Sequence, residues 1–146
     1  MPALNDAILL VPSAATAASG NLVVPGKGLG RYRACVLLLD VTAAATLAGD
    51  TLNVYVQKNV GPPGGTAVWS DMASFTQVLG NGGAKQFRCG LATSGVAVPA
   101  MAAVGAAALA AGSVSSGEAW SSDWRVQWVV AGTGTFTWSL TGHFQD

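Results

Sequence analysis

The sequence predicts an all-β fold in which short antiparallel strands form a sandwich or a barrel. Apolar and polar residues alternate with a period of two over several segments, as they do in strands that bury one face. Turn sequences rich in glycine and proline separate these segments at short intervals. The chain has 146 residues, the size of one domain, so we expect a single domain over residues 1–146.

Three segments alternate most clearly and predict three strands, at residues 51–58, 124–130 and 135–144. Threonine and other polar residues occupy one face of each segment, while valine, leucine and aromatic residues occupy the other. Such a division suits a pleated surface that is half buried. The apolar faces that we expect in the core are Leu52, Val54 and Val56, then Trp124, Val126, Trp128 and Val130, and finally Phe136, Trp138, Leu140 and Phe144.

The remaining strands are expected from weaker patterns. Residues 31–42 begin by alternating and become apolar on both faces from residue 34 to residue 39, which is typical of a central strand covered on both sides. The Gly-Thr-Gly turn at residues 132–134 predicts a hairpin between the last two strands. Residues 99–112 are rich in alanine and predict either a short helix or an irregular connection. Shorter or weaker strands are expected at residues 7–11, 22–24, 74–79 and 86–91.

The composition favours association with other protein surfaces. Hydrophobic residues make up 51% of the chain and charged residues only 10%, against about 25% charged in ordinary domains. Large exposed apolar areas usually mark interfaces, so we expect an oligomer or a permanent partner. The abundance of alanine and glycine is the alternative explanation of the apolar excess.

The charge balance argues against nucleic acid as a partner, because the net charge is zero and phosphate binding needs a basic surplus. The one local basic group, Lys27, Arg31 and Arg33, is interpreted as the solvated start of a strand. No segment has the roughly 20 apolar residues that a membrane span requires. The start of the chain also lacks the basic region of a signal peptide. We therefore expect a soluble protein made in the cytoplasm, with no membrane partner.

Residues that could support catalysis or metal binding are scarce. The single histidine, His143, lies three residues from the C-terminus, and no Gly-x-Ser-x-Gly motif is present, so we expect no enzyme. Cys35 and Cys89 lie in apolar segments without a companion ligand and are expected to be small buried side chains. No metal or cofactor is expected from ligands so dispersed. The carboxylates considered for acid–base chemistry, and assigned to turns and caps instead, are Asp40, Asp50, Asp71, Glu118 and Asp123.

The five tryptophans divide into two groups. Those on the apolar faces of the predicted strands are expected in the core, whereas Trp69 and Trp120 lie near loops. We take Trp69 and Trp120, with Leu4 and Ile8 of the N-terminal segment, as candidate interface residues. A carbohydrate-binding module that uses Trp69 or Trp120 is the alternative from another functional class. In that alternative, Asp71 or Asp123 would bind the sugar beside the ring.

Four segments together resemble small virion proteins of tailed bacteriophages, and the resemblance spans most of the chain. They are DAILLVPSAATAASG near the start, TLNVYVQ, WSDMASFTQVLGNGG, and DWRVQWVVAGTGTFTWSLTGHF at the end. The resemblance implies an antiparallel β-sandwich of the jelly-roll type. It also implies a cement or decoration protein on the capsid surface of the virion, a homotrimer that binds the major capsid protein. A head–tail or tail component of such a particle is the second structural interpretation. Residues 1–6 would then act as an extended arm that grips a neighbour.

Overall fold

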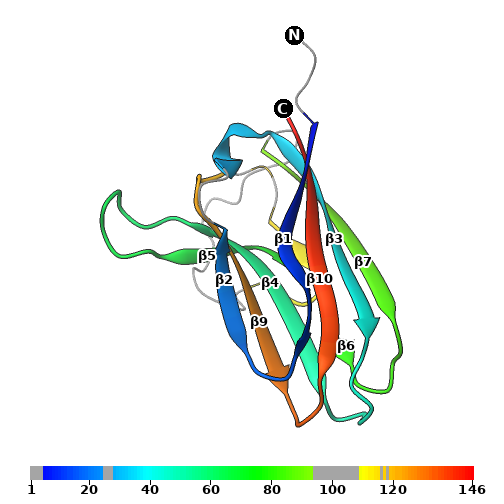
Figure 1. Cartoon of the computed structure of the whole chain (residues 1–146). Coiled ribbons are helices and arrows are strands. Elements are labelled where there is room, and N and C mark those ends of the chain that lie inside the picture. Colours follow the sequence, from blue (N-terminus) through cyan, green and yellow to red (C-terminus); the bar gives the residue numbers. More distant parts are fainter. Residues whose placement is uncertain (1–4, 25–27, 94–108, 116, 118) are drawn as a thin grey trace.

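A computed structural model describes residues 5–24, 28–93, 109–115, 117 and 119–146, and it confirms the all-β sandwich. Two antiparallel sheets pack face to face (Figure 1). The four-stranded sheet has the order β1 (Asn5–Thr16), β10 (Phe136–Gln145), β3 (Ala34–Ala43) and β7 (Lys85–Ala92). The six-stranded sheet has the order β2 (Gly20–Val24), β9 (Trp124–Ala131), β4 (Thr51–Asn59), β5 (Trp69–Ser74) and β8 (Ser113–Val114), with β6 (Val78–Leu79) also on β4. The 3-10 turn η1 (Leu29–Arg31) precedes β3.

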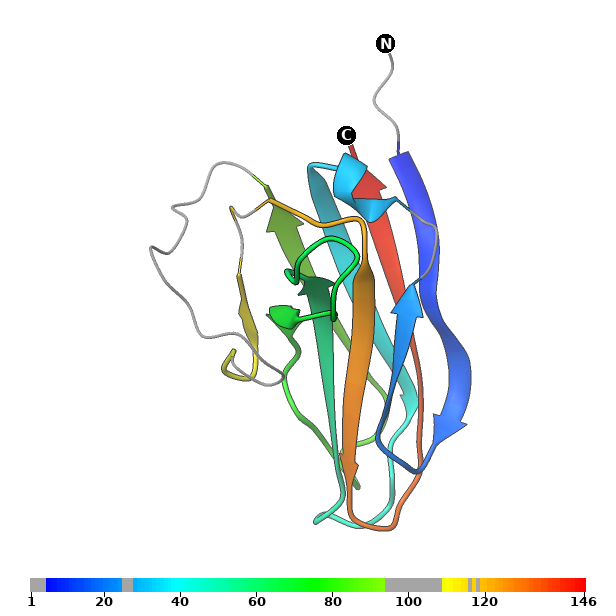
Figure 2. The same cartoon turned by 90° about the vertical axis from the view of Figure 1, so that its left-hand side faces the viewer.

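The strand order is that of a jelly roll. β1 pairs with β10, β2 with β9, β3 with β7 and β4 with β5, all antiparallel. The first four strands therefore pair in reverse order with four later strands, as if one long hairpin were rolled around the core. In the view of Figure 2 the six-stranded sheet lies in front of the four-stranded sheet. The jelly-roll topology agrees with the fold class expected from the sequence.

The core lies between the inner faces of the two sheets, and the apolar faces predicted for β4, β9 and β10 point into it. On β4 the opposite face is also buried, at Tyr55 and Gln57. Trp124 and Trp138 are fully buried, as expected from their position on the apolar faces. Aromatic rings join the two sheets edge to face: the centroids of Trp128 and Trp138 are 5.4 Å apart, and those of Trp124 and Phe144 are 5.5 Å apart. Such edge-to-face pairs add to the free energy of burying the rings.

The expected hairpin between the last two strands is wrong, because β9 and β10 belong to different sheets. The turn between them crosses from one sheet to the other around the buried carboxylate of Asp50. Thr133 N–H donates a hydrogen bond to Asp50 Oδ1 at 3.0 Å. A Cβ atom on Gly132 would lie 1.8 Å from Asp50 Oδ1, and one on Gly134 would lie 2.2 Å from Asp50 Oδ2. The glycines are thus needed for close approach to Asp50 and not for a two-strand turn.

Some strand boundaries differ from those expected. The weak strand expected at residues 74–79 is only the short β6, and β5 lies before it. Four consecutive residues of β5, residues 71–74, are buried, so covering both faces removes the alternation that would have revealed the strand. The segment expected at residues 7–11 is longer, because β1 pairs along β10 from Asn5 to Thr16. Most of the alanine-rich stretch expected to be helical or irregular, residues 99–108, lies outside the described residues.

Candidate interaction surfaces

The outer face of the four-stranded sheet is apolar and open. The prediction that β3 is covered on both sides is wrong, because only its inner residues are buried. The side chain of Val36 is 45% exposed, and that of Leu9 on β1 is 58% exposed. The apolar residues that the sequence assigned to a second covered face therefore point to solvent, with nothing from the described part of the chain packed over them.

The strand register defines this surface, which we call the outer apolar face. One row runs Gly90, Val36, His143 and Ala7 across the four strands, and the next runs Arg88, Leu38, Thr141 and Leu9. Small residues leave hollows on both sides of Val36 and His143. His143 is exposed here, as the sequence predicted for the polar side of the last strand. The result is a flat surface of short side chains, in which the one basic residue, Arg88, lies at the edge.

The outer face of the six-stranded sheet carries polar side chains that form hydrogen bonds with one another. Gln57 is fully buried, and its Nε2 donates to Asp71 Oδ1 at 2.7 Å and to Gln127 Oε1 at 3.2 Å. Its Oε1 accepts a hydrogen bond from Arg125 Nε at 2.7 Å. The backbone N–H of Leu109 donates to the other carboxylate oxygen of Asp71 at 3.2 Å. We call Gln57, Asp71, Gln127 and Arg125 the polar cluster; it joins β4, β5 and β9.

The charged groups of the polar cluster have partners within the chain, as expected of a network that stabilises the fold. The guanidinium of Arg125 lies over the ring of Trp69, 4.7 Å from its centroid. Burial lowers the pKa of Arg125, while the nearby Asp71 opposes that shift. Burial raises the pKa of Tyr55, and the charge of Asp71 raises it further. Both oxygens of the Asp71 carboxylate already accept hydrogen bonds. We therefore interpret Asp71 as a structural residue of the network that joins the three strands.

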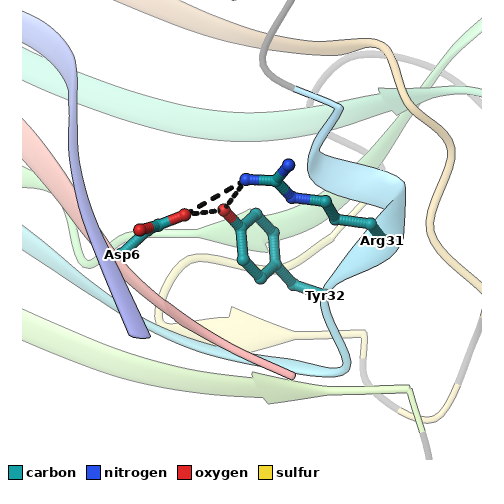
Figure 3. A network of polar contacts seen from close by, with 3 residues as sticks. All are labelled: Asp6, Arg31 and Tyr32. Carbon is teal, nitrogen blue, oxygen red and sulfur yellow. Dashed lines mark hydrogen bonds and ion pairs between the residues drawn. The ribbon is translucent and has the colours of Figure 1, made fainter. Parts of the chain in front are cut away.

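A second polar group fastens the start of β1 to η1. Figure 3 shows Asp6 turned toward Arg31 and Tyr32. Arg31 Nη2 lies 3.1 Å from Asp6 Oδ2, and the hydroxyl of Tyr32 donates to the same oxygen. The hydrogen bond with the Tyr32 hydroxyl raises the pKa of Arg31. Asn5 and Asp6, expected in an extended arm, are paired with β10, and residues 1–4 lie outside the described residues.

The two cysteines are free thiols on the inner face of the four-stranded sheet. Burial raises the pKa of Cys35 to about 12, with a smaller contribution from the charge of Cys89. Burial also raises the pKa of Cys89 to about 11. Because the thiolate is the nucleophile, both side chains are inert near neutral pH. In the part of the chain that the structure describes, no three His, Cys, Asp or Glu residues gather as metal ligands.

The structure places the candidate interface residues in different surroundings. Trp69 lies on β5, under the guanidinium of Arg125. Trp120 and Ile8 are partly buried and pack against the core, and Trp120 meets Trp124 edge to face at 5.2 Å. Leu4 lies outside the described residues. The structure does not gather Trp69, Trp120 and Ile8 into one surface, and the role of all four residues at an interface stays a prediction.

Sequence reasoning missed Leu9 and Val36, which are more exposed than Trp69, Trp120 and Ile8. Leu9 adjoins Ile8 in β1, and the pleat turns it to the opposite side of the sheet. The signal for Val36 was the run from residue 34 to residue 39, whose apolar residues on both faces were assigned to two covered sides.

Neither the models of known protein families nor the curated proteins give a match to this chain. Among the described residues, no helix has the length and apolar character needed to span a bilayer.

Proposed function

We propose that this chain is a structural virion protein that cements or decorates a bacteriophage capsid as a homotrimer bound to major capsid proteins. The observation that carries the proposal is the outer apolar face. Exposed apolar areas often mark protein–protein contacts. Here apolar residues of β1 and β3 flank Thr141 and His143 of the central strand β10. Leu9 and Val36 are its most exposed apolar side chains, at 58% and 45%.

The chemistry of this face suits a permanent contact between flat surfaces. Alanine, glycine and valine lose little side-chain entropy when a partner covers them. The hollows beside Val36 and His143 offer places for side chains of the partner. On the two central strands β10 and β3, these rows hold Val36, His143, Leu38 and Thr141, with no carboxylate, lysine or arginine among them, so docking need not bury an unpaired charge there.

The jelly-roll topology is compatible with the proposal without selecting it, since capsid proteins and lectins both use it. The resemblance of the sequence to small phage virion proteins favours the capsid. The carbohydrate-binding alternative gains no support from the polar cluster, because both oxygens of Asp71 already accept hydrogen bonds within the chain. A head–tail or tail component would use the same face, and the position of the protein on the particle separates these two.

Light scattering over a range of concentrations, followed by co-sedimentation with capsids that lack the protein, tests the proposal. We expect a mass three times the 14.6 kDa of one chain and binding to the capsids. Val36→Glu should abolish co-sedimentation, because it places a charge in the centre of the outer apolar face. Val23→Glu is the matched control, since Val23 is 44% exposed on β2 of the other sheet. A monomer at every concentration would refute the trimer. Absence of the protein from the capsid pellet would refute the cement function.

A further inference from the structure

The strand β7 forms an edge of the four-stranded sheet (Figure 1), and no described strand pairs with its outer side, so we call it the open edge. On one side it pairs with β3 over eight residue pairs. Along its length, Lys85, Gln86, Arg88 and Gly90 are exposed to solvent. An edge strand of this length presents backbone donors and acceptors that another strand can use.

The register shows which backbone groups face outward. Thr93 N–H donates to Arg33 O at 2.8 Å, so this pair is one of the hydrogen-bonded pairs of the antiparallel ladder. Hydrogen-bonded pairs alternate with pairs whose N–H and C=O point away from the partner strand. Counting along the register from Arg33 and Thr93, the outward-facing residues of β7 are Gln86, Arg88 and Gly90.

At the C-terminal end of β7, a backbone group of the edge already has a hydrogen-bond partner. Ala92 belongs to the same outward-facing set, and its carbonyl accepts a hydrogen bond from Gly117 N–H at 2.6 Å. This contact agrees with the parity derived from Thr93. It also limits the open stretch to the residues before Ala92, which leaves about five residues for an added strand.

A pocket lies beside the open stretch, between β7 and the opposite sheet edge formed by β5 and β8. Its lining includes Phe75, Phe87 and Cys89. Phe75 is buried and Phe87 is half-buried, so an apolar side chain entering the pocket would meet aromatic surface. A strand laid along β7 would direct alternate side chains toward this pocket and the others toward solvent.

The positive charges on β7 indicate which kind of strand could pair with it. Lys85 and Arg88 are exposed on β7, and the nearby Asp40 is half-buried and accepts a hydrogen bond from Gln86 at 3.2 Å. Cationic side chains on an edge deter pairing with an uncharged or basic strand. They favour a strand that carries carboxylates, because opposite charges across neighbouring strands attract.

We propose that the open edge of β7 is a docking site for an extended acidic segment of another polypeptide, which adds to the four-stranded sheet as a fifth strand. The backbone of Gln86, Arg88 and Gly90 provides the hydrogen bonds, and the pocket beside Phe87 accepts a small apolar side chain. Arg88, whose side chain lies on the outer face, pairs with a carboxylate of the segment, and the exposed Lys85 adds positive charge at the end of the strand. This mode of recognition combines backbone affinity with side-chain selection, and it does not depend on the capsid function proposed above.

Nuclear magnetic resonance with a short peptide tests the site on the intact chain. The probe is the capped peptide EVEVEV, compared with KVKVKV and with an EVEVEV that is N-methylated on alternate residues. We expect EVEVEV to slow hydrogen exchange at the amides of Gln86, Arg88 and Gly90 and to leave those of Phe87 and Cys89 unchanged. The N-methylated peptide should give no protection, because it lacks the donors that an added strand needs. Protection by both charged peptides alike, or none by EVEVEV, would overturn the proposal.

Charge reversal supplies the second test. The double variant Lys85→Glu, Arg88→Glu should weaken EVEVEV binding by about tenfold or more, since the net attraction between β7 and the carboxylates becomes a repulsion, and should favour KVKVKV. Asn21→Glu, which adds a carboxylate to the edge strand β2 of the other sheet, is the control and should bind EVEVEV as the parent chain does. An unchanged affinity in the double variant would show that the charges of β7 do not select the segment.

Discussion

The two outer faces of the sandwich differ in where their side chains find partners. On the six-stranded sheet, Gln57 is fully buried and Asp71 is 4% exposed, and they bond to each other and to neighbouring strands. On the four-stranded sheet, Val36 and Leu9 are exposed and nothing in the described chain covers them. The side chains of the polar face find their partners within the chain, whereas no part of the described chain covers the apolar face.

The two faces therefore contribute to different free energies: the polar face to that of folding, and the apolar face to that of association. A buried polar network lowers the free energy of the folded chain as long as every member has a partner, and it raises that free energy steeply when one partner is lost. An exposed apolar face contributes little to folding, because its side chains remain in water in both states. Its contribution comes when a partner covers it. Variants on one face should therefore change stability, and variants on the other should change association.

The largest expected effect contrasts neighbouring positions on the two sides of β3. Val36→Cys places a thiol on the outer apolar face, whereas Cys35 points into the core with its pKa raised to about 12 from 9.0. At pH 8 the thiolate of Cys35 should be about a thousandfold scarcer than that of an ordinary thiol, and its alkylation slower in proportion. Mass spectrometry of iodoacetamide-labelled peptides over pH 7–10 measures both rates. Equal rates at the two positions would show that the inner face is open as well.

The next largest effect concerns the polar cluster. Gln57→Leu keeps the size of the side chain but removes partners from Asp71 and Arg125, so we expect a loss of about 3 kcal/mol in the free energy of unfolding. Urea unfolding followed by tryptophan fluorescence measures it. The matched change on the other face, Gln86→Leu, should stay within about 0.5 kcal/mol of the parent chain, because Gln86 is exposed. Similar losses in the two variants would contradict the contrast between the faces.

A smaller effect is expected where β1, the strand that carries Leu9, is fastened to η1. Tyr32 is buried, and its hydroxyl bonds to Asp6 and Arg31. Tyr32→Phe keeps the ring against Phe144 but removes the hydroxyl, so unfolding should become easier by about 1 kcal/mol. Hydrogen exchange should rise first at the amides that open the β1 ladder. If exchange there stays as slow as in the parent chain, β10 alone holds the start of β1.

The smallest effect on stability is expected on the outer apolar face itself. Leu9→Ser should change the free energy of unfolding by no more than about 0.5 kcal/mol, because the side chain is already 58% exposed. The same variant should lower the apparent affinity in capsid co-sedimentation. A large loss of stability without loss of binding would assign Leu9 to the core of the fold and not to a contact.

The predicted strands at residues 51–58, 124–130 and 135–144 agree with β4, β9 and β10 because apolar and polar residues alternate along each of them. β5 escaped prediction because residues 71–74 are buried on both faces, which erases the alternation. The hairpin failed for another reason. A Gly-Thr-Gly turn has the same local chemistry whether it joins paired strands or crosses between sheets around Asp50.

The candidate surfaces were only partly predictable. The apolar composition indicated an exposed face, but the residues named for it, Trp69, Trp120 and Ile8, lie under Arg125 or against the core. The run of apolar residues around Val36 carried the correct signal. It was assigned to a covered strand, because a sequence cannot distinguish a face covered by its own chain from one left for a partner.

The sequence by itself determined most of the strands and which of their sides faces the core, because alternation is a local record of burial. Only the tertiary structure decided which strands pair, where the last turn leads and which apolar side stays uncovered. It also brought together Gln57, Asp71 and Arg125, which come from three separate strands. The physical reason is that pairing depends on contacts between residues far apart in the chain, whose free energy no short window of sequence records.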